Sequence, residues 1–281
     1  MLSQLDPTLV DRQTRNNRET EGLWDLYTEH RLRVNSLIEA HAPDGRLVVL
    51  GAGNANSFDL ESLTARFATL HLADLDPVAL AHGVEKQIAA GRDKIVLHAP
   101  IDLSGVLPQL PVWARTPPEI DELKALPETV SASLAAALPG PFDVVVSEGL
   151  LSQILFTCFK ALGDGPVLMR VLPWVLLAHL RTLVALARPG GSCLLVTDTA
   201  SSEGLPPQEL LPESDGLGLL HDLDQRGKLF TGTSPALLTR ALRENGLAGR
   251  IEAVRFVPPW HWQFLRERSA LVYALAFHTR A

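Results

Sequence analysis

The stretch RLVVLGAGNANSFDLESL, residues 46–63, decides the fold. In it an apolar run, Leu47–Leu50, meets the small-residue turn Gly51–Gly53, and two asparagines lead into a predicted helix over Ser57–Phe67. Glycine leaves the backbone bare, so a ligand can approach it closely. A strand, a glycine turn and a helix in this order are typical of proteins that hold nucleotide-like ligands.

The rest of the chain alternates short apolar runs with helical stretches. The predicted strands are Leu47–Leu50, Thr69–Ala73, Ile95–His98, Phe142–Ser147, Ser192–Thr197, Ile251–Val257 and Ala270–His278. The predicted helices are residues 8–40, Ser57–Phe67, Pro77–Ala90, Leu123–Leu138, Trp174–Ala187 and Pro235–Asn245, the last closed by Gly246. This alternation predicts an α/β fold, a doubly wound and mostly parallel sheet with helices on both faces.

The domain organisation follows from the breaks in this pattern. Residues 1–45 form a predicted N-terminal helical extension, and residues 46–281 form a predicted α/β domain with an insertion at about 103–140. A second long segment, 201–229, is rich in Gly, Pro, Ser and acidic residues. Connections this long inside a compact domain are often lids or binding elements.

Composition excludes several classes of function. A net charge of −7 argues against a nucleic-acid partner, which usually requires a basic surface. The only cysteines, Cys158 and Cys193, stand in no metal-binding spacing, so we expect no disulfide and no metal site. The N-terminal residues lack the pattern of a signal peptide, and the longest apolar run, Val171–Leu180, is too short to span a bilayer. We therefore expect no membrane partner and a cytoplasmic protein.

A carboxylate follows the second predicted strand at the spacing from the glycine turn that a ribose-binding acid has. Asp74 stands 21 positions after Gly53, where an acid can accept both hydroxyls of a ribose. The alternative role is a cap for the helix that begins at Pro77. Asp76, directly before Pro77, is the better cap, so we assign Asp74 to the ribose.

Two cofactors suit this plan, NAD and S-adenosylmethionine. In the dinucleotide pattern G-x-G-x-x-G/A the third small position is Asn56 here, which does not fit. Asp59 falls in the predicted first helical turn, where its charge would oppose a pyrophosphate but would suit an ammonium or a sulfonium. Compensation of the helix dipole by Asp59 explains that residue equally well.

Five motifs, in order between Val48 and Val257, resemble class I S-adenosylmethionine-dependent methyltransferases. The first resembles the family's glycine motif, the second its ribose-binding acid, and the third the strand and turn beneath the methyl donor. The fourth resembles the turn into strand 5, and the last resembles the helix, glycine and strand that finish the sheet. In the same order, the five motifs are VVLGAGNAN, LHLADLDPVAL, PFDVVVSEGLLSQI, LARPGGSCLLVTDT and LLTRALRENGLAGRIEAVRFV.

The resemblance implies a Rossmann-like, mostly parallel seven-stranded sheet with an antiparallel last strand, and S-adenosylmethionine as cofactor. The acid that usually precedes the first glycine by two positions is Val49, and the third glycine is Ala55. Alanine replaces glycine there without strain only where φ is negative. The cofactor-binding residues that the resemblance implies are Gly51, Ala52, Gly53, Asn54, Asn56, Asp59, Asp74, Leu75, Asp102, Ser147 and Glu148.

The same resemblance makes strands 6 and 7 a hairpin whose connection, Pro258–Arg268, lies near the mouth of the site. The aromatic residues of this connection either wall a substrate pocket or plug the sheet end, and the N-terminal helix either covers the cofactor or packs on the surface. The proposed substrate-binding residues are Tyr27, Arg31, Gln153, Trp260 and Trp262.

Methyl transfer needs a general base only when the nucleophile arrives protonated, as a hydroxyl or an ammonium. The candidate bases are Glu148, His30 and His261. His98 and His179, inside a predicted strand and helix, are interpreted as structural.

The sequence thus predicts methyl transfer from S-adenosylmethionine to a small molecule or peptide. Two alternatives remain. One is a methyltransferase-like protein that binds a ligand or partner without catalysis, and the less favoured one is an NAD-dependent oxidoreductase. The sequence leaves open the substrate, the methylated atom and the oligomeric state.

Overall fold

The computed structural model describes residues 7–41, 44–212 and 216–281. Residues 1–6 and 42–43 of the predicted extension, and residues 213–215 of the predicted segment 201–229, lie outside the described residues.

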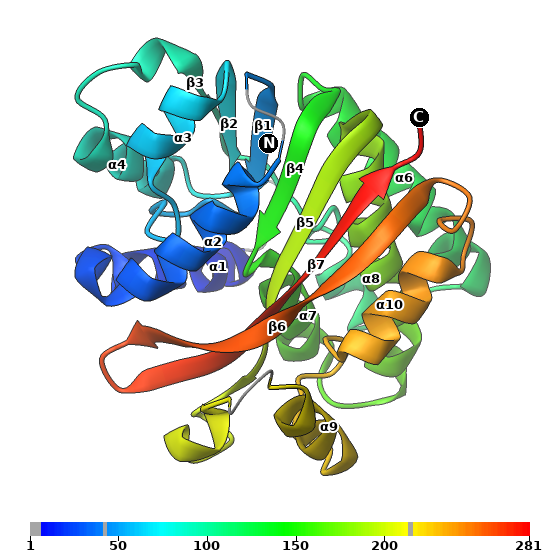
Figure 1. The fold of residues 1–281 in the computed structure, drawn as a ribbon. Helices are drawn as coiled ribbons and strands as arrows, with labels where there is room; N and C mark the ends of the chain where they lie inside the picture. Colours follow the sequence, from blue (N-terminus) through cyan, green and yellow to red (C-terminus); the bar gives the residue numbers. More distant parts are fainter. Residues whose placement is uncertain (1–6, 42–43, 213–215) are drawn as a thin grey trace.

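The described chain builds a seven-stranded sheet in the order β3-β2-β1-β4-β5-β7-β6 (Figure 1). Strands β1 to β5 pair in parallel, and β7 runs antiparallel to both of its neighbours, β5 and β6. The predicted mostly parallel sheet with an antiparallel last strand is therefore confirmed. The strands are β1 Arg46–Leu50, β2 Thr69–Ala73, β3 Ile95–His98, β4 Phe142–Glu148, β5 Ala187–Ser201, β6 Ile251–Leu265 and β7 Arg268–Thr279.

The predicted connection Pro258–Arg268 is wrong as a loop, because β6 continues through it to Leu265. Pro258 and Pro259 carry no N–H for a ladder, and the register with β7 shifts between Val257 and Trp260. A shift of this kind lets the strand pass two prolines and resume pairing. The result is a long β6–β7 hairpin whose tip lies at the same end of the sheet as the carboxyl end of β4 (Figure 1).

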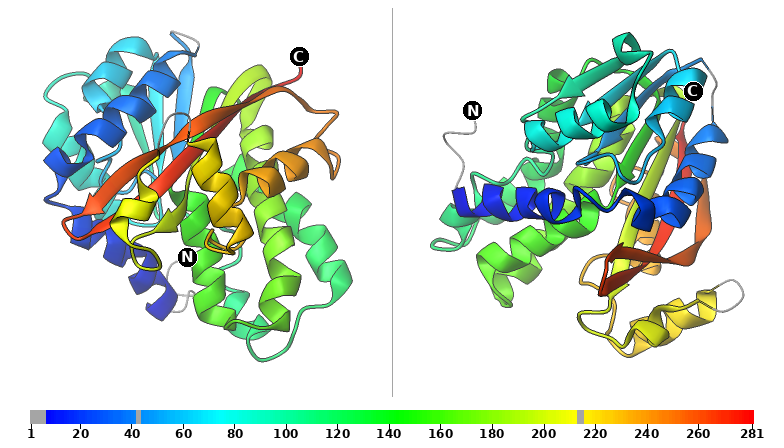
Figure 2. Two further views of the ribbon diagram at one scale, coloured as in Figure 1. Left: turned by 60° about the horizontal axis from the view of Figure 1, so that its bottom comes forward. Right: turned by 90° about the vertical axis from the view of Figure 1, so that its left-hand side faces the viewer.

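Helices cover both faces of the sheet (Figure 2). Successive β1 residues enter different cores: Val48 packs with α6, α7 and α8, whereas Leu47 and Val49 pack with α2, α3 and α4. This alternation is the doubly wound arrangement that the sequence predicts. The helices of the first three quarters of the chain are α1 Pro7–Thr20, η2 Trp24–Tyr27, α2 Thr28–Glu39, α3 Leu60–Arg66, α4 Pro77–Gln87, η3 Arg92–Lys94, α5 Leu110–Trp113, α6 Ile120–Ala137, α7 Leu150–Leu162, α8 Pro166–Leu186 and η4 Pro207–Leu210.

The last two helices are α9 Leu217–Gln225 and α10 Pro235–Arg243. The single helix predicted over residues 8–40 is divided near Gly22, where a turn and η2 separate α1 from α2. Helix α7 was not predicted from the sequence, and α8 begins at Pro166, eight residues before the predicted start at Trp174. Among the described residues, α8 alone is long and apolar enough to cross a membrane, and 67% of its most apolar window is buried in the protein.

Candidate active site

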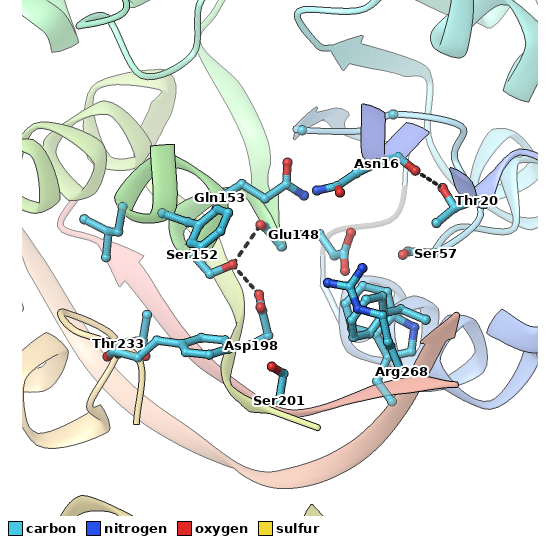
Figure 3. Close-up of a pocket in the computed structure, with 18 of the residues that line it drawn as sticks. Asn16, Thr20, Ser57, Glu148, Ser152, Gln153, Asp198, Ser201, Thr233 and Arg268 are labelled. Atoms are coloured by element: carbon cyan, nitrogen blue, oxygen red, sulfur yellow. Dashed lines mark hydrogen bonds between the residues drawn. The ribbon is translucent and has the colours of Figure 1, made fainter. Parts of the chain in front are cut away.

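A cavity of about 520 Å³ opens at the carboxyl ends of β1, β4 and β5 (Figure 3). One part of its wall is the glycine turn with the facing residues of α1, and another is Glu148 with the start of α7. The remaining walls come from the end of β5, the loop before α10 and the tip of the β6–β7 hairpin. The predicted site residues that line it are Tyr27, Gly51, Ala52, Gly53, Asn54, Asn56, Glu148, Gln153 and Trp262.

The glycine turn presents bare backbone but few donors. The N–H groups of Gly51 and Ala52 both donate to the carbonyl of Ala73, at 2.9 and 3.3 Å, and the Gly53 N–H donates to Asp74 Oδ2 at 2.8 Å. A pyrophosphate needs free N–H groups, whereas an ammonium or a sulfonium does not. The turn therefore suits a ligand with a positively charged end.

Both glycines of the turn have left-handed φ, which disfavours any other residue. At Gly51, with φ of +81°, a Cβ would also lie 2.9 Å from Leu150 Cβ, which cannot move without its helix. At Gly53, with φ of +49°, the Cβ would lie 2.5 Å from Asn17 Oδ1 on α1, a side-chain end that can move aside. Close packing therefore adds to the need for glycine mainly at Gly51.

Ala55, at the third position of the motif, also adopts a left-handed conformation, with φ of +54°. The condition under which alanine replaces glycine without strain, a negative φ, is not met. An L-residue in this region costs about 1–2 kcal/mol. The strained alanine is buried, so the packing around it holds the turn in a shape that the sequence opposes.

Two side chains of the turn fasten α1 over it. Asn54 Nδ2 donates to the carbonyl of Asn17 and lies 3.2 Å from Thr20 Oγ1, and Asn56 Nδ2 donates to the carbonyl of Thr20 at 2.7 Å. Asn56 Oδ1 is buried without a hydrogen-bond partner in the part of the chain that the structure describes. The structure thus gives both amide nitrogens a role in docking α1, and their predicted contact with a cofactor stays a prediction.

The acids after β2 and before α3 hold backbone groups. Asp76 caps α4 by accepting from the N–H groups of Val78 and Ala79, which confirms it as the cap. Asp74 accepts from the Gly53 N–H and, at 2.9 Å, from the Asp76 N–H, and its burial raises the pKa of its carboxyl.

Asp59 is the N-cap of α3, where it accepts from the Ser62 N–H at 3.0 Å. This is the helix-compensating role that the sequence left open beside a cofactor contact. Neither Asp59 nor Asp74 lines the cavity as described.

Three further cofactor candidates also lie outside the described cavity. Asp102 accepts from the N–H groups of Ser104, Gly105 and Leu107, and Leu75 is buried. Ser147 is fully buried with its hydroxyl 2.9 Å from His179 Nε2. Burial lowers the pKa of His179 to about 4, so this imidazole is neutral near pH 7. The contact of these three residues and of Asp74 with a cofactor stays a prediction.

Glu148 and His30 form a buried pair whose protonation can be derived. His30 Nε2 lies 3.0 Å from Glu148 Oε1, and the Trp260 indole N–H donates to His30 Nδ1 at 3.1 Å. An indole N–H can only donate, so Nδ1 must accept and Nε2 must carry the imidazole proton. His30 in this arrangement orients Glu148 and has no free lone pair to act as a base itself.

An aromatic cluster stands behind this pair. Trp262 stacks on His30 with ring centroids 4.3 Å apart, and Tyr27 meets Trp262 edge-on at 5.3 Å. Trp260 and Trp262 therefore lie on one face of β6, as their alternation predicts. His261 between them does not line the described cavity, and burial lowers the pKa of its imidazole.

Arg31 also lies away from the cavity as described. Its guanidinium donates to the carbonyls of Trp24 and Asn56, both at 2.9 Å, and stands 3.5 Å over the Trp24 ring. The structure thus places Arg31 in the attachment of α2 to the glycine turn, and its predicted contact with substrate has no support in this geometry.

Sequence reasoning missed a second acid in the cavity, Asp198. In the β4–β5 register Glu148 pairs with Val196, so Asp198, two residues on, emerges on the same face one pleat farther. Ser152 Oγ donates to Asp198 Oδ1. Burial, with a smaller effect of the Glu148 charge, raises the pKa of Asp198 to about 6 against the lowering effect of Ser152.

A signal for Asp198 was present, because it directly follows the predicted strand Ser192–Thr197, and ligands bind beyond the carboxyl ends of parallel strands. Most of the other missed lining residues come from α1, from the unpredicted α7, from the loop before α10 and from the β6–β7 hairpin. Of these, only the hairpin residues lie in a segment, Pro258–Arg268, that was predicted near the mouth of the site. They include Asn16, Asn17, Phe156, Phe159, Leu229, Phe230, Thr233, Phe264 and Arg268. None of the described lining residues belongs to the insertion 103–140. Within the described residues, no group of three or more His, Cys, Asp or Glu could hold a metal ion.

Comparisons with known proteins complete the description. No family model matches the chain, and no curated protein matches it. Among solved structures it is similar to YcgJ from Bacillus subtilis, at 10% identity over 90% of this chain and 98% of the other, with a TM-score of 0.46. A SAM-dependent methyltransferase from Methanosarcina mazei matches at 11% identity over 87% and 97%, also with a TM-score of 0.46.

An rRNA methylase from Streptococcus thermophilus is similar at 8% identity over 92% of this chain and 94% of the other, with a TM-score of 0.41. The observed sheet, with β7 antiparallel between β5 and β6, is the one that the sequence resemblance implies. By its own strand order the chain has a Rossmann-like, doubly wound fold in the arrangement expected from the resemblance to class I S-adenosylmethionine-dependent methyltransferases.

Proposed function

We propose that this protein transfers a methyl group from S-adenosylmethionine to a small molecule or peptide. One observation carries the proposal: a single cavity brings the bare glycine turn, Gly51–Gly53, together with the carboxylate of Glu148. When bound, the cofactor supplies an electrophilic methyl group on a positively charged sulfur.

The residues around the turn fit that group better than they fit a dinucleotide. The N–H groups of Gly51, Ala52 and Gly53 already have acceptors, so they offer nothing to a pyrophosphate. Glu148 adds a negative charge to the same cavity, which favours a cationic ligand and opposes an anionic one. This argument, together with Asn56 in the fingerprint, disfavours the NAD-dependent alternative.

The chain's own groups can prepare the nucleophile. Glu148 accepts the proton of an incoming hydroxyl or ammonium, since it lines the cavity beside the glycine turn and His30 keeps its other oxygen in place. Trp260 fixes the tautomer of His30, and Trp262 with Tyr27 closes one side of the cavity against water. Positioning and exclusion of water are the main catalytic contributions expected for such a displacement.

Calorimetry tests the cofactor. We expect S-adenosylhomocysteine to bind with a Kd in the micromolar range, about −7 to −8 kcal/mol, and NADH to give no heat of binding. Loss of the binding signal in the presence of excess S-adenosylmethionine would show that both occupy one site. If NADH bound and S-adenosylhomocysteine did not, the proposal would be abandoned.

A second candidate function, ligand binding without catalysis, has an observation in its favour. Asp74 already accepts two backbone N–H groups and lies outside the described cavity, as do Leu75 and Asp102. In this arrangement α1 is held over the glycine turn, and its Asn17 also reaches Asp76 at 3.3 Å. Single-turnover transfer of a labelled methyl group separates the two candidates, because a binding protein would retain S-adenosylhomocysteine yet transfer nothing.

A further inference from the structure

We propose that the methyl acceptor is a primary or secondary amine on an apolar body, bound as its ammonium between Glu148, Asp198 and the aromatic wall of α7. This inference rests on the proposed function, and it names the substrate class of the same cavity. Two independent features point to it, the charge of the cavity and the nature of its far wall.

The charge of the cavity is strongly one-sided. Arg268 is the one cationic side chain among the described lining residues, and it is paired with Glu203. Glu19, Glu148 and Asp198 remain as carboxylates without a cationic lining partner. Among the described residues no hydrogen bond engages Glu148 Oε2, so this buried side chain keeps an acceptor for a ligand. An anionic substrate would meet uncompensated negative charge there, whereas an ammonium would neutralise it.

The far wall of the cavity is apolar and partly uncovered. Phe156, Phe159 and Phe230 are 50%, 38% and 36% exposed, although large aromatic side chains are usually buried. Leucines complete this wall, at positions 155, 168, 172 and 229. Uncovered rings that converge on a cavity indicate a surface that a ligand covers.

The same rings already attract an ammonium of this chain. Lys160 Nζ stands 4.9 Å from the centroid of the Phe156 ring and 5.8 Å from that of Phe159. A cation over an aromatic face is favoured by the ring quadrupole, and the effect grows where water is excluded. The wall therefore combines affinity for an apolar body with tolerance of positive charge.

An amine also makes use of both acids in the reaction. Glu148 takes the proton of the bound ammonium, which frees the nitrogen lone pair. That pair forms the new bond to the methyl carbon, while the carbon–sulfur bond breaks and its electrons remain on sulfur as a neutral thioether. The product is again an ammonium. Because Glu148 is then protonated, Asp198 supplies the carboxylate charge that holds the product.

The first experiment is a binding measurement without cofactor, so that it does not depend on catalysis. The probes are 4-phenylbutylamine, 4-phenylbutan-1-ol and 4-phenylbutanoate, which share one apolar body and differ in charge. Calorimetry at pH 7.5 should give the amine at least tenfold higher affinity than the alcohol and no binding of the carboxylate. Equal affinities of the amine and the alcohol, or binding of the carboxylate, would overturn the inference.

A matched pair of variants assigns the effect to the cavity. Asp198→Asn should lower the affinity for 4-phenylbutylamine about tenfold and leave that for 4-phenylbutan-1-ol unchanged. Asp164→Asn removes the same charge from an exposed position outside the cavity and should change neither. An unchanged amine affinity in Asp198→Asn, with the fold intact by circular dichroism, would contradict the inference.

Calorimetry with S-adenosylhomocysteine separates the two levels of the argument. Binding of that compound without discrimination between amine and alcohol overturns the amine assignment and leaves the proposed function standing. Discrimination without S-adenosylhomocysteine binding overturns the proposed function and, with it, the role of the amine as methyl acceptor.

Discussion

The two halves of the cavity differ in how their polar groups are used. Around the glycine turn, the N–H of Gly53 meets Asp74, and the amides of Asn54 and Asn56 hold α1. Around the acids, by contrast, Glu148 keeps a carboxylate oxygen without a hydrogen bond from any described residue, and Phe156 is half exposed. Apart from Asn56 Oδ1, these polar groups of the first half are satisfied by the protein itself, whereas the second half leaves groups for a ligand to complete.

This difference separates a framework from a recognition surface. Polar groups that satisfy each other add stability and fix the turn, so changes there should first reduce stability. Buried carboxylates without a cationic partner and aromatic rings exposed to water reduce stability. Changes to them should therefore first alter binding or catalysis. Variants of the two halves should therefore differ in whether stability or function changes first.

Glu148→Gln should reduce the rate of methyl transfer about 100- to 1000-fold, within the range that general acid–base catalysis contributes. The glutamine carbonyl can still accept from His30 Nε2–H, so the fold should remain stable. Single-turnover measurements with a labelled methyl donor check the rate, and urea denaturation checks the fold. A variant that keeps the wild-type rate would show that Glu148 is not the base.

Asp198→Asn should stabilise the protein at pH 7 by up to about 3 kcal/mol, at 1.36 kcal/mol for each pKa unit. The pKa of Asp198 rises from 3.8 to about 6 on folding, mainly through burial, with Ser152 and Glu148 as its charged or hydrogen-bonding neighbours. The folded state therefore binds the Asp198 proton more tightly than the unfolded state does. The stability that this proton contributes to the wild type is present below about pH 4 and is lost as the pH rises to about 6.

Urea denaturation at pH 4 and pH 7 measures this effect, and the wild type and the variant should differ only at pH 7. The asparagine carbonyl can still accept from Ser152, so the comparison isolates the charge. A variant less stable than the wild type at pH 7 would argue that Asp198 belongs to the framework half.

Asp74→Ala should destabilise the protein by about 2 kcal/mol, because the N–H groups of Gly53 and Asp76 lose their acceptor. Thermal denaturation without ligand measures this loss, with Asp164→Ala as an exposed control. If stability were unchanged and only the affinity for S-adenosylhomocysteine fell, Asp74 would be a ribose ligand and not part of the framework.

Gly53→Ala and Gly91→Ala isolate the contact between the turn and α1. Both glycines have positive φ, +49° and +82°, so both alanines carry about 1–2 kcal/mol of backbone strain. At Gly91 the nearest atom to the added Cβ is Thr64 Oγ1 at an ordinary 3.9 Å, whereas at Gly53 the Cβ meets Asn17 Oδ1 at 2.5 Å, so the Asn17 side chain must move and its hydrogen bond to Asp76 is lost. We expect Gly53→Ala to lose about 1 kcal/mol more in urea denaturation. Equal losses would mean that α1 does not press on the turn.

The sequence predicted the sheet more fully than the site. β2 and β3 were predicted at their observed bounds, and β1 and β4 within one residue, because a short run of apolar residues is a local property of the sequence. The helix α7 was missed, since its apolar face, with Phe156 and Phe159, follows directly on β4 and a short turn. The residues that α7 contributes to the far wall of the cavity were therefore not predicted either.

Within the candidate site, local capping was predicted and long-range pairing was not. Asp76 was identified as a cap because its partners lie two and three residues along the chain. Asn54 and Asn56 were expected to contact a cofactor, and no local pattern shows that α1, more than 30 positions earlier, takes their amides.

The sequence by itself therefore determined the strands, the glycine turn and the helix cap, since hydrophobic periodicity and backbone preference act over a few residues. Only the tertiary structure decided that Asp198 stands beside Glu148, because the β4–β5 register brings them together. It also decided the tautomer of His30, through partners 118 and 230 positions away. Such contacts depend on strand register and helix docking, which the whole core fixes and no short stretch of sequence encodes.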